Sequence, residues 1–373
     1  MRDLCEQFGI DLPLFAFSHC RDVVAAVTNA GGLGVLGASS HTPEELEHEL
    51  AWIDEQVGGR PYGVDIVVPD RLVGDGESVS RAELAERVPE AHREFVRGLL
   101  AQHGVAADPD ELFVLDRVPD AETGERLLDV AFRHPIRLIA NALGVPPPFM
   151  TERAKAEGVP VAALVGAKEH AVRQVRAGVD LLIAQGAEAG GHVGEVSTLV
   201  LVPEVVEAIR PIREVPVLAA GGIVTGRQMA AAIALGAAGA WTGSVWLTTD
   251  EAETAPHTVQ KLLAASSRDT VRSRSRTGKP CRQLRSAWTE AWDAPESPQA
   301  LPMPLQSVLA RRALARVDKL AESGNTGAQE LATYFVGQGV GLMTTSRPVR
   351  EVVRAMAEDY LQAVDRLNAS VTG

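Results

Sequence analysis

The stretch Val215-Pro-Val-Leu-Ala-Ala-Gly-Gly-Ile-Val-Thr-Gly226 has the pattern of a buried strand that turns directly into a helix. Residues 215–220 are nearly all apolar, and the pair Gly221 and Gly222 ends the run. Thr225, followed three residues later by Gln228, forms a capping-box pattern, which predicts that a helix opens at this point. The stretch therefore predicts one β-then-α unit with a glycine-rich turn.

The same rhythm of a short apolar run and an amphipathic stretch recurs along the chain, which indicates parallel strands with helical crossovers. The expected strands are Leu12–Phe17, Leu33–Gly37, Tyr62–Val68, Ile136–Leu143, Val159–Val165, Val179–Gln185, Val215–Ala220 and Ala240–Leu247. The expected helices are Arg21–Ala30, Pro43–Gln56, Glu122–Arg133, Phe149–Glu157, Lys168–Ala177, Pro203–Ile209 and Thr225–Leu235. Eight such units favour an α/β fold of the TIM (β/α)8 barrel type over an open doubly wound sheet.

The chain has 373 residues, whereas a single barrel takes about 250, so the remainder needs other places. We expect the barrel within residues 1–250, interrupted after the third strand by a polar, helix-forming insertion at about 74–120. Residues 251–333 are expected to form a smaller, mainly helical accessory region on the substrate side. Residues 334–373 have the pattern of terminal helices that pack back on the barrel.

The composition argues against several classes of protein and site. Aromatic residues make up only 4% of the chain, which disfavours a β-sandwich, and a formal charge of −13 disfavours nucleic acid as a partner. No apolar run is long enough to span a membrane, and the first residues lack the pattern of a signal peptide. We therefore expect a cytoplasmic protein with no membrane partner. The three cysteines have no metal-ligand spacing, so no metal site is expected.

The basic residues are concentrated between positions 268 and 285, where seven stand against one acidic residue. If this segment lies near the barrel mouth, Arg272 and Arg276 could receive the phosphates of a second substrate. The alternative is a solvated basic loop or a contact between the subunits of a homo-oligomer. Both interpretations stay open at this point.

The stretch Ala184-Gln-Gly-Ala-Glu-Ala-Gly-Gly-His-Val-Gly194 follows the sixth expected strand, so it lies at the carboxyl end of the barrel. Catalytic residues of such barrels sit at this end. The glycines let the backbone wrap a planar ligand, and His192 stands among them, which favours a catalytic role for this side chain. His19, just beyond the first strand, is a second candidate at the mouth.

Two turns are candidates for binding a phosphate. Gly221 and Gly222 follow the seventh expected strand, and Thr242-Gly-Ser244 lies on the eighth. Barrels often bind phosphate after these strands, where glycines and a helix N-terminus offer N–H groups. The run Gly32–Gly37 matches the dinucleotide motif GxGxxG, but here the helix precedes the strand, which is the reverse of the required order. A phosphorylated planar cofactor, FMN, fits this arrangement.

Together these residues resemble the nitronate monooxygenase family, also called 2-nitropropane dioxygenases. The resemblance rests on Gln185-Gly-Ala-Glu-Ala-Gly-Gly-His192, Ala220-Gly-Gly-Ile223, Thr242-Gly-Ser244 and the early Gly31-Gly-Leu-Gly34. It implies an FMN-dependent TIM barrel with a smaller second domain. It also implies an enzyme that oxidises alkyl nitronates with O2 to carbonyl compounds and nitrite, without NAD(P)H.

The resemblance assigns roles to residues of this chain, with His192 as the catalytic residue beside the flavin. The cofactor contacts that it implies are at Asp65, Gln185, Gly186, Gly190, Gly191, Gly221, Gly222, Thr242, Gly243 and Ser244. The chain departs from the family pattern at the first strand, which ends in Ala16-Phe-Ser-His19 instead of Ala-Pro-Met. It departs again at Asp65, where the family has asparagine, because an ionised carboxylate would repel the carbonyl oxygens of a flavin.

Related barrels with the same glycine motifs are NAD(P)H-dependent flavin reductases that act on quinones or on enoyl- or acyl-CoA thioesters. This is the alternative function, and the basic segment would then receive the phosphates of the second substrate. A phosphate-binding barrel without flavin is a third hypothesis. It would favour a Schiff-base lysine at a strand end, and only Lys168 lies near one.

Overall fold

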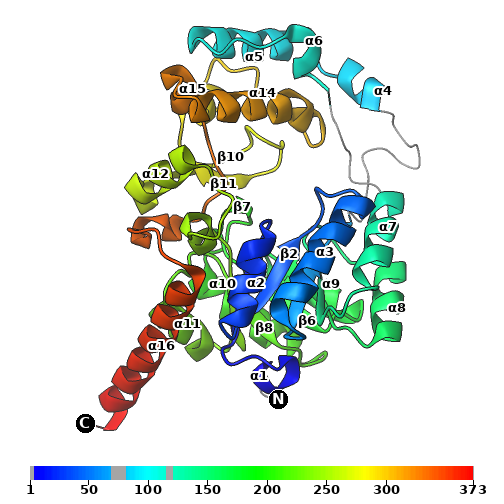
Figure 1. Ribbon diagram of the computed structural model, residues 1–373, viewed down its shortest axis with the longest axis vertical. Helices are drawn as coiled ribbons and strands as arrows, with labels where there is room; N and C mark the ends of the chain where they lie inside the picture. The colour runs from blue at the N-terminus through cyan, green and yellow to red at the C-terminus, as the bar shows by residue number, and fades with distance from the viewer. Residues whose placement is uncertain (1–3, 69–80, 115–120, 373) are drawn as a thin grey trace.

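The computed structural model describes residues 4–68, 81–114 and 121–372, and its centre is a closed barrel of eight parallel strands (Figure 1). In barrel order the strands are β1 (Leu14–Ser18), β2 (Leu33–Gly37), β3 (Tyr62–Asp65), β4 (Leu138–Asn141), β5 (Val161–Val165), β6 (Leu181–Gln185), β8 (Val217–Ala220) and β9 (Gly239–Thr242). The barrel closes where β1 pairs with β9, with Phe15 opposite Trp241. The predicted TIM barrel is confirmed, and the open sheet is excluded.

Helices surround the barrel in the alternation that the sequence predicts. They are α2 (Arg21–Asn29), α3 (Pro43–Val57), α7 (Ala121–Ala131), α8 (Pro148–Glu157), α9 (Lys168–Arg176), α10 (Thr198–Ile209) and α11 (Gly226–Ala234). The predicted capping box of α11 is present: Thr225 Oγ1 accepts from the N–H of Gln228, and Gln228 Oε1 accepts from the N–H of Thr225. Local side-chain chemistry thus sets where this helix begins.

Two element boundaries differ from the prediction by five residues, and the others by three residues at most. The eighth strand ends at Thr242, because the next residues form a 3-10 helix, η1 (Ser244–Thr248). Val245 and Trp246 are buried there, so their apolar character reflects burial and not strand structure. Helix α10 begins at Thr198, five residues before the predicted start at Pro203, so Pro203 lies inside the helix, a position that sequence rules disfavour.

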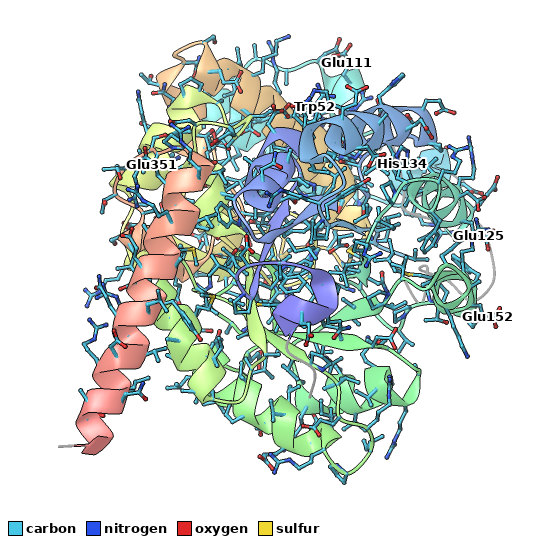
Figure 2. The ribbon with its side chains drawn as sticks, turned by 60° about the horizontal axis from the view of Figure 1, so that its bottom comes forward. Trp52, Glu111, Glu125, His134, Glu152 and Glu351 are labelled. Atoms are coloured by element: carbon cyan, nitrogen blue, oxygen red, sulfur yellow. The ribbon has the colours of Figure 1, made fainter. Side chains whose placement is uncertain are left out.

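The amino-terminal end of the barrel is closed by α1 (Leu4–Phe8), which comes forward in Figure 2. Phe8 packs edge-on against Phe15 of β1, with the ring centroids 5.3 Å apart. Leu33, Leu138 and Leu181 from other strands are buried in the same cluster. The barrel interior is therefore filled at this end, and a ligand has to enter from the carboxyl end.

Further helices form a layer beyond the barrel, at the top of Figure 1. They are α4 (Arg81–Glu86), α5 (Glu90–Gln102), α6 (Pro109–Leu112), α13 (Ala287–Asp293), α14 (Leu305–Glu322) and α15 (Thr326–Leu331). One hydrophobic cluster, with Trp288 and Trp292 among its members, joins the insertion to the region after the barrel. The expected ends of the insertion, near 74 and 120, lie outside the described residues, and the domain limits stay a prediction.

A small antiparallel sheet lies between this layer and the barrel. Its strands, in order, are β10 (Thr270–Ser273), β11 (Cys281–Leu284) and β7 (Gly191–His192). The basic segment 268–285 therefore contains a hairpin. The sequence did not predict these strands, because they are short and mix polar with apolar residues.

The remaining described elements are α12 (Pro256–Ala264), η2 (Ser267–Asp269), η3 (Gln338–Leu342) and α16 (Val349–Thr372). Helix α16 runs beside α11 and α2 and then extends past the barrel (Figures 1 and 2). It approaches α11 closely because Gly226 has no side chain where the Met356 carbonyl lies.

Acidic side chains such as Glu125 and Glu152 project from the outer helices in Figure 2. None of the described helices has both the length and the apolar composition needed to cross a membrane.

Gly226→Ala is expected to destabilise the protein by about 1–3 kcal/mol, because the added methyl overlaps the Met356 carbonyl oxygen and forces α16 away from α11. Gly98→Ala in α5 is the matched control. Gly98 has open space around its Cα, so alanine is expected to stabilise the helix by about 0.5–1 kcal/mol. Urea unfolding measures both changes. Equal stability of the two variants would contradict the close packing of α16.

Candidate active site

A cavity of about 610 Å³ lies at the carboxyl ends of the barrel strands. The predicted site residues that line it are His19, Asp65, Gln185, Gly190, Gly191, His192, Gly221, Gly222, Thr242, Gly243 and Ser244. The predicted residues that do not line it are Gly186, Arg272 and Arg276. The cavity thus collects residues from segments that are far apart in the sequence, as expected for the mouth of a TIM barrel.

The loop between β6 and α10 is held tightly against its neighbours. The carboxylate of Glu188 accepts hydrogen bonds from the N–H of Thr198, at 2.9 Å, and from its hydroxyl, also at 2.9 Å. This carboxylate therefore caps α10. Gly186 packs directly against Thr198, with no room for a side chain. Gly186 thus shapes the loop from behind and does not face the cavity.

His192 is held by the small sheet and by two side chains. Its Cα lies opposite that of Cys281 on β11. Its Nε2 lies 2.8 Å from Oγ1 of Thr277, in the turn between β10 and β11. Its carbonyl oxygen accepts an N–H from the Gln185 side chain at 3.1 Å. The basic segment therefore supports His192 directly, a role that neither interpretation from the sequence contained.

The histidines of the cavity wall are neutral at pH 7. Burial, and after it the positive charge of Lys279 on the hairpin, lower the pKa of His192 to about 4. The imidazole of His192 can therefore accept a proton at neutral pH. Burial also lowers the pKa of His19, whose Nδ1 lies 2.9 Å from the carbonyl oxygen of Gly37.

The turn after β8 has a backbone conformation that favours glycine, with φ of +112° at Gly221 and +72° at Gly222. The N–H groups of Val224 and Thr225 donate to Gln228 Oε1, at 2.9 and 3.1 Å. In the first turn of α11, the N–H of Arg227 donates to the carboxylate of Asp359 at 2.7 Å, and that of Gln228 donates to Thr225 Oγ1 at 3.4 Å. The glycine pair and the turn after β9 line the cavity, whereas residues 225–228 at the helix start, which the sequence indicated as part of an anion site, do not.

A segment from the carboxyl-terminal part of the chain crosses this end of the cavity. The N–H of Gly337 donates to Ser244 Oγ at 2.8 Å. The N–H of Gln338 donates to the carbonyl oxygen of Glu188, also at 2.8 Å. This segment thereby joins the turn after β9 to the loop that carries His192.

This segment supplies two cavity residues that were not among the predicted site residues, Phe335 and Gly339. The ring of Phe335 lies beside that of His192, with centroids 6.4 Å apart. Closely spaced glycines in Val336-Gly-Gln-Gly-Val-Gly341 were the signal that could have identified it. Phe17 and Trp241 add aromatic rings to the wall, with their own centroids 6.2 Å apart.

Arg272 and Arg276, which the sequence offered as possible ligands of a substrate phosphate, are engaged elsewhere. The guanidinium of Arg272 pairs with Glu195 at 3.0 Å. That of Arg276 lies over the ring of Phe335, 4.4 Å from its centroid, and donates to the carbonyl oxygen of Thr333 at 2.7 Å. Arg276 therefore supports an aromatic residue of the cavity wall, and neither arginine reaches the cavity itself.

Asp65 closes the end of β3 and is 3% exposed. Among the residues that the structure describes, none donates a hydrogen bond to its carboxyl group, and burial raises its pKa to about 7. The neighbouring strand ends are different. Asn141 accepts from the N–H of Val68 at 2.9 Å, so its buried amide is satisfied within the protein. Asp65 is thus a buried polar group that faces a ligand cavity without a partner.

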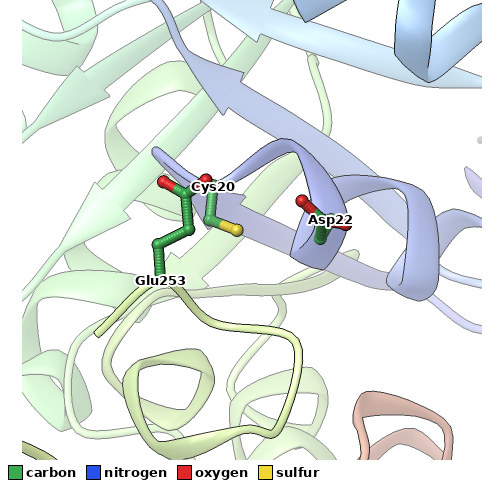
Figure 3. A group of neighbouring side chains, drawn as sticks. All are labelled: Cys20, Asp22 and Glu253. Carbon is green, nitrogen blue, oxygen red and sulfur yellow. The ribbon is translucent and has the colours of Figure 1, made fainter. Parts of the chain in front are cut away.

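Figure 3 shows Cys20, Asp22 and Glu253, whose candidate metal-ligand atoms lie within 4.8 Å of one another. Burial raises the pKa of the Cys20 thiol, and its Sγ donates to the carbonyl oxygen of Glu251 at 3.2 Å. A thiol held in its protonated form is a poor metal ligand. We therefore assign no ion to this group.

The model of the nitronate monooxygenase family matches residues 7–359 of the chain. A Mycobacterium tuberculosis protein named "Putative monooxygenase Rv1533" is 54% identical over 378 aligned positions, which cover 99% of this chain and 98% of that protein. The similarity therefore includes the accessory region as well as the barrel.

Solved structures give the same result. A nitroalkane oxidase from Streptomyces ansochromogenes has a TM-score of 0.81 at 27% identity, covering 98% of this chain and 99% of the other. FabK from Thermotoga maritima has a TM-score of 0.70 at 25% identity and covers 98% of each chain. Because the family model spans nearly the whole chain, and a relative of more than half identity aligns with 99% of it, the chain belongs to the nitronate monooxygenase family.

Proposed function

We propose that this oxidoreductase binds FMN and oxidises alkyl nitronates with O2 to carbonyl compounds and nitrite, with His192 at the reacting centre. The observation that supports it best is the neutral, half-buried imidazole of His192 on a cavity whose wall also contains the glycine turn after β8. Membership of the family makes the chain an oxidoreductase and implies a flavin cofactor. We propose beyond this that the flavin is FMN, that the substrate is an alkyl nitronate, and that His192 acts at the reacting centre.

The cavity residues fit FMN. The bare backbone at Gly221 and Gly222 suits a phosphate group. Ser244 Oγ accepts from Gly337, so its own proton remains for a phosphate oxygen. The hydroxyl of Thr242 already donates to the Phe15 carbonyl at 3.1 Å, so a cofactor contact at this residue would come from its backbone.

Bound FMN would supply the acceptor for the electrons that leave the substrate. The protein would supply position and proton transfer. With Nε2 of His192 engaged by Thr277, Nδ1 is the ring nitrogen left to take the α-proton of a neutral nitroalkane. A preformed nitronate needs no such step. For it, Phe335 and His192 would serve to orient the anion and limit the access of water.

The alternative function is an NAD(P)H-dependent flavin reductase. The sequence feature that favoured it was the basic segment, and the structure removes that support. That hypothesis needed basic side chains free to receive phosphates at the mouth, and Arg272 and Arg276 are engaged with Glu195 and Phe335. The similarity to FabK keeps the alternative as an outcome of the test below.

The purified protein is expected to be yellow, and anaerobic mixing with ethyl nitronate is expected to bleach the flavin absorbance. Rapid bleaching by NADPH, with none by nitronate, would establish the alternative function. A colourless protein that FMN does not restore would overturn both.

His192→Asn is expected to keep its flavin, because the phosphate contacts lie on other segments. Turnover of neutral nitroethane should fall about 10²-fold or more, the typical contribution of a general base. Turnover of preformed ethyl nitronate should fall less, because its α-proton is already gone. Steady-state O2 consumption with each substrate measures the two losses. His170→Asn, an exposed change on α9, is the matched control. Equal losses on both substrates would remove the base role from His192.

Lys279→Met is expected to raise the pKa of His192, because it removes the positive charge that disfavours the imidazolium. Base catalysis is lost as pH falls through the pKa of His192, so the acid limb of kcat/KM for nitroethane should move to higher pH. Lys155→Met, an exposed change on α8, should leave the profile in place. An unmoved acid limb in the Lys279 variant would show that its charge does not reach His192.

A further inference from the structure

Asp65 is a buried acid on the cavity wall, and no neighbouring side chain of the described residues stabilises its carboxyl group. The other titratable side chains that line the cavity are His19, Cys20, His192 and Glu253. None of them shifts the pKa of Asp65, which burial alone raises. A polar group that is removed from water and has no hydrogen-bond partner costs free energy unless a ligand satisfies it. The carboxyl group is therefore placed for a ligand that hydrogen bonds to it.

The barrel order places this group at one end of the ligand space. β3 is third and β8 is seventh in the closed ring of eight strands, so Asp65 lies across the mouth from Gly221 and Gly222. A ligand with its phosphate at the glycine turn must extend across the mouth to meet Asp65. An isoalloxazine has one polar edge, an imide with an N–H donor between two carbonyl acceptors, and that edge matches a carboxyl group.

We propose that Asp65 binds the flavin as the neutral acid: its O–H donates to an imide carbonyl oxygen and its carbonyl oxygen accepts the imide N–H. This inference rests on the proposed FMN site. A neutral carboxyl group offers one donor and one acceptor, as the side chain of asparagine does. An ionised carboxylate offers only acceptors and places a negative charge against the carbonyl oxygens of the ring.

The proposal makes flavin affinity depend on pH in one direction. Below the pKa of free Asp65, which is about 7, the acid is already protonated and affinity is constant. Above it the flavin must bind together with a proton, so affinity falls by up to about tenfold per pH unit. Affinity stops falling at the pH at which Asp65 ionises in the flavin complex. A phosphate dianion at the far side of the mouth would move that point to still higher pH.

The test is the dissociation constant of FMN, measured by the quenching of its fluorescence on titration with the full-length protein from pH 7 to 9. Both phosphate ionisations lie below this window, because the second pKa of a phosphomonoester is about 6. Wild type should lose at least tenfold in affinity across the window. Asp65→Asn should lose less than about twofold, because the amide keeps a donor and an acceptor at every pH.

Asp129→Asn, the same change at an exposed position on α7, is the matched control and should keep the wild-type slope. Riboflavin is the second probe. The slope should persist with riboflavin, because the contact is to the ring and not to the phosphate. If Asp65→Asn fails to fold, Asp65→Ser serves in its place, with the same flat profile expected.

The outcomes separate this inference from the proposed function. FMN binding with the same slope in wild type and in the Asp65 variant would overturn the role of Asp65 and leave the FMN site standing. A slope with FMN that disappears with riboflavin would also overturn it. Failure of both proteins to bind FMN at any pH would overturn the proposed cofactor and, with it, this inference.

Discussion

The antiparallel pairing of β7 with β11 is the contact on which the site depends. It is only two residues long, and it places His192 opposite Cys281 and Gly191 opposite Arg282. Through it the glycine-rich loop of the barrel becomes the edge of a sheet whose other strands belong to the region after the barrel. A side chain on a glycine-rich loop has little orientation of its own, so the barrel alone would leave His192 loosely held. The accessory region acts on the site by positioning this residue.

The same physical cause acts in opposite directions on His192 and Asp65, two of the ionisable groups that line the cavity. Removal from water disfavours the charged form, so it lowers the pKa of His192 and raises that of Asp65. Both shifts bring the group toward neutrality at pH 7.

The barrel could be predicted because each β-then-α unit carries its own local signals: an apolar run, a glycine stop, and a capping box such as Thr225 with Gln228. The glycine turns and His192 could be located for the same reason, since their position follows from the strands before them. The residues that contact His192 could not be predicted from the sequence. Thr277 stands 85 residues from it, and the strands between which Thr277 lies have no clear apolar alternation. The segment of Phe335 was likewise hidden, because its contacts to Ser244 and Glu188 are made by backbone atoms.

The basic segment shows why clustered charge in a sequence is a poor guide to binding. Arg272 pairs with Glu195, Arg276 lies over Phe335, and Arg282 donates to the carbonyl oxygen of Ala187 at 2.8 Å. Each guanidinium thus holds the hairpin to the loop of His192 or supports the cavity wall, a role that suits its several fixed donors. Lys279 differs, because its charge acts on His192 through space and disfavours the imidazolium. The segment therefore acts on His192 by position and by the electric field of its charge, and the clustered charge by itself is no evidence of a phosphate site.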